Sequence, residues 1–312
     1  MFDTTKPLVS VVCPVYNHEP YLRQCLDGIV MQKTNFSFEV IVNDDASTDG
    51  SADILRDYQY KYPDLIKPIY QIKNQYSQGK GILATILFPR TQGKYIAVCE
   101  GDDYWTDPLK LQKQVDYMEA HPECTLCFHN ALVHWYDGSK PDKLFADVEE
   151  RDYSGPELVN TWYSPTASFL FTSFVKDDYI VMMRDYPKMN VGDMPLLVCC
   201  ARKGVIHGFQ DVMSVYGKHA GSYTQFSDAI KTYNIAISWE ERGKAFGNEY
   251  KNICRQFMTG LYLNALFRSI REKNFLMACK CLYRGILRQP VTGIKALIRI
   301  PQEKRARIKN NT

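Results

Sequence analysis

The sequence lacks the long hydrophobic runs that membrane-spanning helices require. No apolar stretch in the 312 residues approaches the roughly 18 residues that cross a bilayer. We also expect no secretory signal, because residues 1–7 are polar and lead directly into an apolar, strand-like segment. We therefore expect a cytoplasmic protein whose contact with a membrane, if it has one, is peripheral.

Two glycine-rich nucleotide motifs are absent as well. A dinucleotide-binding dehydrogenase carries Gly-x-Gly-x-x-Gly after its first strand, and a phosphate loop of the ATPase kind ends in Gly-Lys-Ser or Gly-Lys-Thr. Here the first apolar strand ends in Pro14, Val15, Tyr16 and Asn17, and residues 79–81 (Gly-Lys-Gly) have neither the spacing nor the hydroxyl. The loops therefore exclude both of these nucleotide-binding classes.

The sequence has no pair of cysteine motifs at zinc-ribbon or zinc-finger spacing. Cys124, Cys127 and His129 resemble half of a zinc site, but no second pair lies at the required distance. The ten cysteines are scattered, many of them inside apolar segments. This pattern favours reduced thiols packed as small hydrophobic side chains in a cytoplasmic compartment.

Charge is nearly balanced overall but unevenly distributed. The net charge is +3, yet the segment from Arg268 to Thr312 alone carries +10, which leaves residues 1–267 at −7. Nucleic acid is a poor candidate partner, because aromatic residues do not interleave with the Lys and Arg of residues 289–312. The basic segment is instead compatible with an anionic membrane surface, or with a helical appendage whose charged face is solvated.

The chain does contain alternating strand and helix patterns, which predict an α/β fold. Strand-like segments at 9–15, 38–42, 66–72 and 94–99 alternate with helix-like segments at 21–31, 47–62 and 78–88. This order predicts a doubly wound, mostly parallel sheet with helices on both faces. Further strand material is expected at 125–135 and 167–174, and helices at 176–183 and 194–201.

The C-terminal part has a different, purely helical pattern. Helices are expected at 229–239, 250–266 and 275–287. We therefore predict a catalytic domain over residues 1–224 and a helical, basic extension over residues 225–312.

Carboxylates follow two of the predicted strands at the point where each strand ends. Asp44 and Asp45 follow the second strand, and Glu100, Asp102 and Asp103 follow the fourth. Open α/β sheets bind their ligands at this edge, and clustered carboxylates repel one another unless a cation joins them. One loop can therefore accept a base N–H group while the other holds Mg²⁺ or Mn²⁺ against a diphosphate. The alternatives are a helix-capping turn at Asp44 and a solvated acidic turn near Asp102.

Four segments in register resemble the family 2 glycosyltransferases of the A-type (GT-A), nucleotide-diphospho-sugar-binding fold. They are residues 9–17 (VSVVCPVYN), 39–49 (EVIVNDDASTD), 93–105 (GKYIAVCEGDDYW), and 191–197 (VGDMPLL) together with 216–222 (YGKHAGS). They cover roughly residues 8–222 in the order that the family has. Each segment alone is weak, but the four together are specific.

The resemblance assigns most of these residues to the donor. It implies that a nucleotide-sugar is bound by Pro14, Tyr16, Asn17, Asp44, Asp45, Glu100, Asp102 and His219. Asp45 would receive the base, and Asp102 and Asp103 would bind the Mn²⁺ or Mg²⁺ cofactor. The family's Asp-x-Asp motif falls on residues 100–102, where Glu100 replaces the usual Asp. His219 would contact the diphosphate, with a packed loop histidine as the alternative.

Asp193 is the expected catalytic base. In the family a Glu-Asp pair occupies this place, but here Gly192 replaces the Glu. A carboxylate at the start of a helix can also serve only as a cap, so this alternative stays open.

These residues together predict an inverting, metal-dependent glycosyltransferase. It would transfer a sugar from a nucleotide-diphospho-sugar, by resemblance UDP-linked, to a hydroxyl of a saccharide or lipid-linked saccharide in cell-surface polysaccharide synthesis. The alternatives are a non-catalytic nucleotide-sugar or carbohydrate-binding module, and a nucleotidyltransferase. The latter would want a glycine-rich loop bearing Arg and Lys after the first strand, and this sequence has none.

Overall fold

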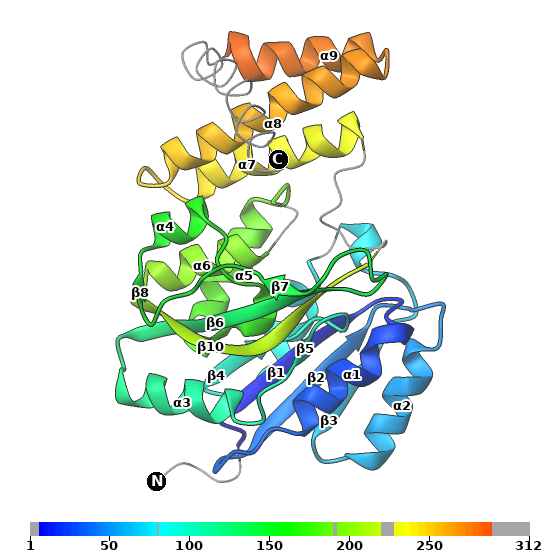
Figure 1. Ribbon diagram of the computed structural model, residues 1–312, viewed down its shortest axis with the longest axis vertical. Helices are drawn as coiled ribbons and strands as arrows, with labels where there is room; N and C mark the ends of the chain where they lie inside the picture. Colours follow the sequence, from blue (N-terminus) through cyan, green and yellow to red (C-terminus); the bar gives the residue numbers. More distant parts are fainter. Residues whose placement is uncertain (1–5, 80, 190–191, 220–227, 289–312) are drawn as a thin grey trace. The chain divides into compact units, whose positions relative to one another are not determined.

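The computed structural model describes residues 6–79, 81–189, 192–219 and 228–288 of the chain. The chain divides into two compact units (Figure 1). Unit 1 comprises residues 1–185 and 192–222, and unit 2 comprises residues 186–191 and 223–312. The predicted domain boundary at 224/225 lies outside the described residues. Within the described residues, no helix combines the length and the apolarity needed to cross a membrane.

Parallel strands form the N-terminal half of the sheet in unit 1. β1 (Val9–Val15) lies between β2 (Phe38–Asp44) and β4 (Tyr95–Val98), and β3 (Ile66–Tyr70) extends the sheet beyond β2. β1 and β4 are buried almost throughout, as their continuous apolar runs predict. Because these strands run in the same direction, the loops that follow β1, β2 and β4 emerge at one edge of the sheet.

Helices cover both faces of this sheet (Figure 1). Val9, Val11 and Cys13 of β1 share a buried cluster with apolar residues of α1 (Glu19–Val30), α2 (Ser51–Lys61) and α3 (Lys110–Ala120). On the other face, Tyr179 of α5 (Lys176–Asp185) packs against Phe88 with ring centroids 5.2 Å apart. The predicted α/β class is confirmed.

The second half of the sheet is mixed. Beyond β4 the order is β9 (Leu170–Thr172), β6 (Cys124–Trp135), β10 (Val205–Lys218) and β5 (Tyr104–Trp105). β10 is parallel to β6, whereas β9 is antiparallel to both β4 and β6. Short strands β7 (Lys143–Leu144) and β8 (Arg151–Tyr153) pair with β6 and β10. The sequence did not predict β10, because its register shifts and its exposed residues 210–212 break the alternation.

Two predicted elements differ from the structure. The helix expected at 78–88 is divided into a 3₁₀ turn, η1 (Tyr76–Gln78), and a short helical segment, in which a π-helical turn, η2 (Leu83–Leu87), continues into a 3₁₀ turn, η3 (Phe88–Arg90). Gly79 adopts a left-handed conformation (φ 78°), which ends the first turn, and residue 80 lies outside the described residues. The strand expected at 167–174 is limited to β9, because 3₁₀ turns η4 (Thr166–Ser168) and η5 (Ser173–Val175) flank it.

Two further helices of unit 1, α4 (Gly155–Asn160) and α6 (Asp193–Ala201), come from the part of the chain that also forms the second half of the sheet. α4 begins at Ser154, whose side chain accepts a hydrogen bond from the backbone N–H of Glu157. α6 is almost fully buried. Its apolar sequence therefore belongs to a core helix.

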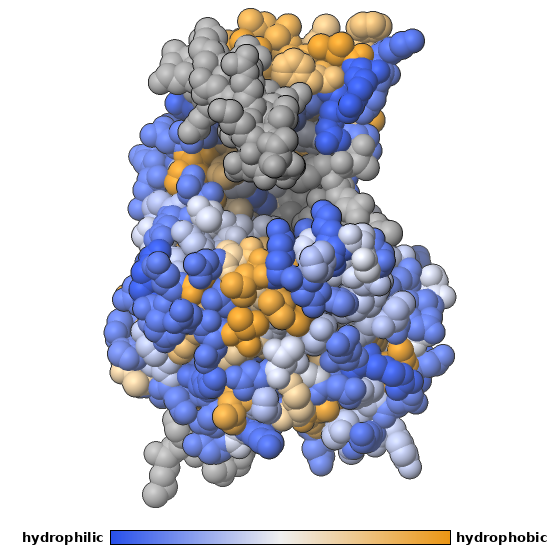
Figure 2. Space-filling view, in the orientation of Figure 1, coloured by the Kyte–Doolittle hydropathy of each residue, from blue (hydrophilic) through white to orange (hydrophobic). Residues whose placement is uncertain are grey.

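Unit 2 contains the predicted C-terminal helices. These are α7 (Ala229–Ala245), α8 (Lys251–Arg271) and α9 (Phe275–Leu282), which continues into η6 (Tyr283–Leu287). Leu263, Leu266 and Cys281 form its small buried core. Phe275 and Leu276 are each 70% exposed, and Figure 2 shows apolar side chains gathered over this part of the unit. The basic residues 289–312 lie outside the described residues.

Candidate active site

Two acidic loops meet at the carboxyl end of β1. The backbone N–H of Asp45 donates to the carbonyl of Val15 (2.9 Å), and that of Gly101 donates to the carbonyl of Pro14 (3.2 Å). The loop after β2 and the loop after β4 are therefore both fixed to the last residues of β1. The structure thus brings the two groups of carboxylates to one edge of the sheet.

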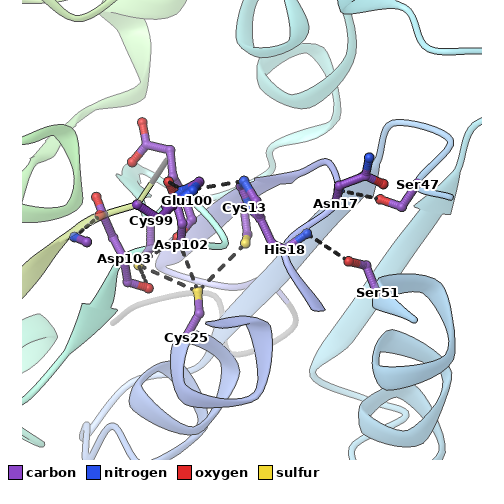
Figure 3. A network of polar contacts seen from close by, with 12 residues as sticks. Cys13, Asn17, His18, Cys25, Ser47, Ser51, Cys99, Glu100, Asp102 and Asp103 are labelled. Carbon is purple, nitrogen blue, oxygen red and sulfur yellow. Dashed lines mark hydrogen bonds and ion pairs between the residues drawn. The ribbon is translucent and has the colours of Figure 1, made fainter. Parts of the chain in front are cut away.

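The loop after β1 is held to the loop after β2 by Asn17 and His18. Asn17 has φ 54°, a left-handed conformation that asparagine tolerates better than most residues. Its N–H donates to Ser47 Oγ (2.9 Å), and its side-chain oxygen accepts from the N–H of Thr48 (2.8 Å). The N–H of His18 donates to Ser51 Oγ (2.9 Å) (Figure 3). Asn17 therefore shapes this edge.

The residues predicted to bind the nucleoside differ in their exposure and in their hydrogen bonds. Tyr16, two residues after Pro14, is 45% exposed. Both carboxylate oxygens of Asp45 accept backbone N–H groups, from Gln75 (2.8 Å) and Tyr76 (3.0 Å). Asp44 is also buried, but its Oδ1 has no hydrogen-bond partner. A buried acceptor without a donor is costly, so Asp44 Oδ1 is available to a ligand N–H or O–H group.

Asp102 lies between two histidines. Its Oδ2 is 3.0 Å from His219 Nε2, and its Oδ1 is 3.9 Å from His18 Nε2. Burial acts to raise the pKa of Asp102, but the His219 hydrogen bond and the two histidine charges outweigh it and hold the pKa below its usual value. Burial lowers the pKa of His18, which favours the neutral imidazole. The group therefore presents an ionised carboxylate and at least one neutral imidazole.

This group fits a divalent cation. One ligand atom from each of His18, Asp102 and His219 lies within 4.8 Å of the other two. Two imidazole nitrogens and one carboxylate oxygen suit Mn²⁺ and similar first-row metals, whereas Mg²⁺ prefers oxygen ligands alone. The geometry and the donor atoms thus agree with a metal at this position.

Aromatic rings close the site on one side. The rings of Tyr21 and His219 are 4.7 Å apart, and those of Tyr21 and Tyr136 are 4.2 Å apart. The hydroxyl of Tyr136 donates to the backbone carbonyl of Asp102 (3.3 Å). These contacts fix His219 and Asp102 relative to α1 and β6.

Asp103 occupies a more buried position than Asp102. Its Oδ1 accepts the backbone N–H of Gly217 (2.8 Å), which ties the acidic loop to the end of β10. Burial, reinforced by the charges of Asp102 and Glu100, raises the pKa of Asp103 well above its usual value. A Cβ atom at Gly217 would lie 2.1 Å from the carbonyl oxygen of Asp102, so only glycine permits this approach. The expected metal contact of Asp103 stays a prediction.

Glu100, in the loop after β4, is influenced by several neighbouring side chains. Burial raises its pKa to about 7; a hydrogen bond from the Thr166 side chain opposes this shift, and the charges of Asp102 and Asp193 add to it. Its Oε2 is buried without a partner. The carboxyl of Glu100 therefore lies within electrostatic reach of both Asp102 and Asp193.

Asp193 begins α6 and is buried. Its Oδ1 accepts the N–H of Met194, the next residue in the first turn of α6 (2.7 Å). Its expected role as catalytic base stays a prediction. Residues 190–191, which precede this turn in the resemblance, lie outside the described residues. Burial raises the pKa of Tyr179, and the charge of Asp193 raises it further. The Tyr179 phenol therefore lies close to the Asp193 carboxylate.

Tyr179 explains why residue 192 is glycine. A Cβ atom at Gly192 would lie 2.2 Å from the Tyr179 hydroxyl oxygen. The phenol thus fills the space that the side chain of the family's usual Glu would enter. The sequence shows that Gly192 replaces the family's Glu, but it does not assign Tyr179, Thr166 or His18 to the site. Only His18 carried a signal, because it directly follows the quoted segment ending at Asn17.

Buried thiols form the floor beneath the acidic loop. Cys25 Sγ lies 3.9 Å from Cys13 Sγ and 3.8 Å from Cys99 Sγ (Figure 3). Burial raises the pKa of Cys99 to about 11, so its thiol stays neutral. The carboxylates of the acidic loop therefore lie next to uncharged, buried thiols, where electrostatic interactions are screened less than in water.

Comparisons with known proteins identify relatives of this site. The family model described as "Glycosyl transferase family 2" matches residues 10–169. The uncharacterized protein Rv1520 of Mycobacterium tuberculosis is 37% identical over 245 residues, which cover 75% of this chain and 64% of that protein. TuaG of Bacillus subtilis, named as a candidate glycosyltransferase of teichuronic acid biosynthesis, is 33% identical over 156 residues, which cover 50% of this chain and 59% of TuaG.

Solved structures share the fold at low sequence identity. TarS 1–349 of S. aureus in complex with UDP-GlcNAc has a TM-score of 0.58 and 19% identity, covering 93% of this chain and 79% of that one. The mannosyltransferase PcManGT of Pyrobaculum calidifontis, in complex with GDP-Man and Mn²⁺, has a TM-score of 0.53 and 17% identity, covering 90% and 75%. The GT-A architecture of unit 1 is thereby confirmed.

Proposed function

The chain belongs to glycosyl transferase family 2, and from this premise we propose that it transfers a sugar from a nucleotide-diphospho-sugar to an acceptor hydroxyl. The observation that carries this proposal is the attachment of two acidic loops to the end of β1, with Asp102 between two histidines. The chain spans 64% of the length of the first curated relatives it matches, so the proposal concerns the described site.

The nucleoside is proposed to bind beside the loop after β2. Asp44 Oδ1, buried and without a partner, offers the acceptor that a base N–H requires, and Asp45 lies next to it. Tyr16 and Pro14 would cover the base and ribose, while Asn17 shapes the loop. UDP is the proposed nucleotide, in keeping with the UDP-GlcNAc complex of TarS.

The diphosphate is proposed to bind beside Asp102. His18, Asp102 and His219 would hold a Mn²⁺ or Mg²⁺ ion, and Mn²⁺ suits the two imidazole donors better. Such an ion stabilises the negative charge that develops on the departing diphosphate. Asp103 would support this group through Gly217, or ligate the ion directly as the sequence predicted. Glu100, whose pKa is raised by burial and by the charges of both Asp102 and Asp193, is proposed to contact the transferred sugar.

Asp193 is the proposed general base. It would take the proton from the acceptor hydroxyl while that oxygen bonds to the anomeric carbon. The bond from the anomeric carbon to the diphosphate oxygen breaks, its electron pair leaves with the nucleoside diphosphate, and the proton ends on Asp193. A single displacement of this kind inverts the anomeric centre.

The proposed acceptor is a saccharide, free or lipid-linked, of a cell-surface polysaccharide. The relationship to TuaG, with its teichuronic acid name, supports this class. The exposed apolar residues of α9 and η6, together with the exposed Lys280, support peripheral binding to an anionic membrane. The basic residues 289–312, which belong to the same prediction, lie outside the described residues.

One assay separates catalysis from simple donor binding. The release of nucleoside diphosphate from UDP-GlcNAc, UDP-Glc and GDP-Man is measured with Mn²⁺ and a saccharide acceptor mixture, and thermal shifts report donor binding. Asp193→Asn should lower turnover by about 10²–10⁴-fold while the thermal shift with donor persists, because a general base acts only on the reaction. Near-normal turnover would remove Asp193 from this role. Donor binding without any turnover in the unmodified protein would indicate a non-catalytic module.

A further inference from the structure

Three lysine side chains converge on one indole ring at the end of β6. The Nζ atoms of Lys140, Lys143 and Lys218 lie 5.6, 5.9 and 6.0 Å from the centre of the Trp135 ring. Lys140 and Lys143 come from the hairpin that joins β6 and β7, and Lys218 is the last residue of β10. We call these four residues the Trp135 cluster.

The cluster has a surplus of positive charge. In the part of the chain that the structure describes, none of the three ammonium groups forms an ion pair with a carboxylate. The two acidic residues of the same hairpin offset only part of this charge. Asp142 Oδ1 pairs with His134 (2.8 Å), and Asp137 Oδ1 accepts the N–H of Ser139 (3.0 Å) while its charge interacts with that of Lys140. An indole face attracts a cation, but three like charges on one ring still repel each other.

The half-buried Lys218 feels this repulsion directly. Its ammonium group shares the face of the Trp135 ring with those of Lys140 and Lys143. An anion placed among the three ammonium groups would relieve both the repulsion and the cost of burial. The half-buried indole of Trp135 next to them offers an apolar platform for a ring.

An aromatic shelf extends from this cluster. Trp135 and Lys218 are register partners on adjacent strands, so they share one face of the sheet. Lys218 Nζ lies 5.8 Å from the Tyr216 ring on the same face, and the ring of Phe145 is 5.4 Å from those of both Tyr216 and Trp162.

The far end of the shelf is linked along the chain to the residues around the proposed base. Trp162 precedes the 3₁₀ turn that contains Thr166. The Thr166 side chain forms a hydrogen bond with Glu100, and the charge of Asp193 also acts on Glu100. The next residues along the two strands, Tyr136 and His219, project to the opposite face and contact Asp102. The shelf thus flanks the donor site without being part of it.

We propose that the Trp135 cluster and its aromatic shelf bind the acceptor, and that this acceptor is an anionic saccharide bearing phosphodiester or carboxylate groups. A sugar ring of the acceptor stacks on Trp135, its anionic groups lie among the three ammonium groups, and the chain end runs along Tyr216 toward Asp193. This inference rests on the proposed function, because only a transferase needs an acceptor at this place.

Direct binding tests the inference without requiring turnover. Three oligosaccharides of matched length serve as probes: an oligogalacturonate, a phosphomannan oligomer and a neutral maltooligosaccharide. Their affinities are measured by titration calorimetry at about 50 mM and about 300 mM NaCl, since screening weakens exposed charge pairs. The test variant is Lys140→Gln/Lys143→Gln/Lys218→Gln.

A matched control removes the same charge elsewhere. Lys6→Gln/Lys33→Gln/Lys61→Gln changes three exposed lysines that lie before β1, after α1 and at the end of α2. These positions belong to the opposite edge of the parallel strands. A further variant, Trp135→Leu, removes the ring and leaves the three charges.

We expect one or both anionic oligomers to bind at least about tenfold more tightly than the neutral one, and the test variant to lose that preference. The control should keep it, and Trp135→Leu should weaken binding of every oligomer. Preference for the oligogalacturonate identifies a carboxylate acceptor, and preference for the phosphomannan identifies a phosphodiester. Equal affinity for the neutral oligomer, or equal losses in the test and control variants, would overturn the inference.

Mn²⁺-dependent binding of UDP and GDP, measured on the same samples, separates this inference from the proposed function. Retained nucleotide binding with no anion preference contradicts the acceptor assignment alone. Loss of nucleotide binding in the unmodified protein contradicts the proposed function and the inference that rests on it.

Discussion

The Tyr179 side chain occupies the space beside residue 192, and this leaves Asp193 as the acidic residue at the start of α6. Tyr179 lies under the first turn of α6, and its hydroxyl occupies the space beside Gly192. Asp193 is consequently the one member of the family's acidic pair that remains here. Its proposed role as base therefore depends on a single carboxylate, close to the Tyr179 phenol.

Gly192→Ala should reduce the free energy of unfolding by about 1–3 kcal/mol, because the new methyl group overlaps the Tyr179 hydroxyl. In a Tyr179→Phe background the same substitution should cost less, since the hydroxyl is gone; the difference is the coupling energy of the pair. Urea denaturation of the four proteins of the cycle measures it.

Gly260→Ala is a suitable control for this cycle. No atom lies within 4 Å of a Cβ at Gly260 in α8, so the substitution should be neutral or stabilising by up to about 1 kcal/mol. Equal costs of Gly192→Ala in both backgrounds would contradict the role of the Tyr179 hydroxyl.

The sequence identified individual site residues better than their partners. Asp44, Asp45, Glu100 and Asp102 stand at strand ends, where the alternation of strands and helices places them on one edge. Their partners come from distant segments: the Asp45 carboxylate meets the backbone of Gln75 and Tyr76, and Asp103 meets Gly217. Such pairs depend on tertiary contacts that no local pattern encodes.

At the scale of elements, α3 contains a buried lysine. Lys110 has no exposed surface, and its Nζ donates to Gln114 Oε1 (2.7 Å) and lies 4.1 Å from the centre of the Trp105 ring. Burial lowers its pKa from 10.5 to about 7. The buried Cys127 and His129 face the same region.

This lysine should make stability rise with pH. Between about pH 7 and 10.5 the unfolded chain binds more protons at Lys110 than the folded chain does, so the free energy of unfolding increases over this window. From about pH 7 to about pH 10 the gain relative to Lys110→Met is at most about 4 kcal/mol.

Chemical denaturation of both proteins at the two pH values measures the difference. Lys113→Met, on the same helix but with an exposed, ion-paired ammonium, should shift stability by similar amounts at both values. Parallel pH dependences of the unmodified protein and Lys110→Met would contradict a neutral Lys110 in the folded state.

The element order was predictable where periodicity is clean and failed where it is not. β1, β2, β4 and α6 have uniform apolar patterns and were found as expected. β10 was missed because its exposed residues in the middle of a long strand interrupt the alternation. Residues 78–88 have helical periodicity, but Gly79 and Pro89 limit them to short helical segments.

At the scale of the whole molecule, unit 2 should bind anionic membranes through the apolar side chains of α9 and η6. Phe275→Ser/Leu276→Ser/Leu287→Ser removes three large exposed apolar residues from this surface. The unmodified protein should float with phosphatidylglycerol vesicles, and the variant should remain in the soluble fraction, because apolar burial and charge attraction act together.

Tyr60→Ser/Ile72→Ser serves as the control. These residues are exposed singly in unit 1, where isolated apolar side chains have no membrane role. If the unmodified protein fails to float, or floats no better than the α9 variant, the membrane contact is wrong.

The most direct test of the proposed donor site is the titration of UDP and GDP against the unmodified protein and Asp102→Ala, each with and without Mn²⁺. Asp102 contacts both His18 and His219, so its removal dismantles the group that would hold the ion and the diphosphate. We predict nucleotide binding that requires Mn²⁺ in the unmodified protein and falls by at least about tenfold in Asp102→Ala. Binding that is equally tight without Mn²⁺, or unchanged in Asp102→Ala, would contradict the proposed site.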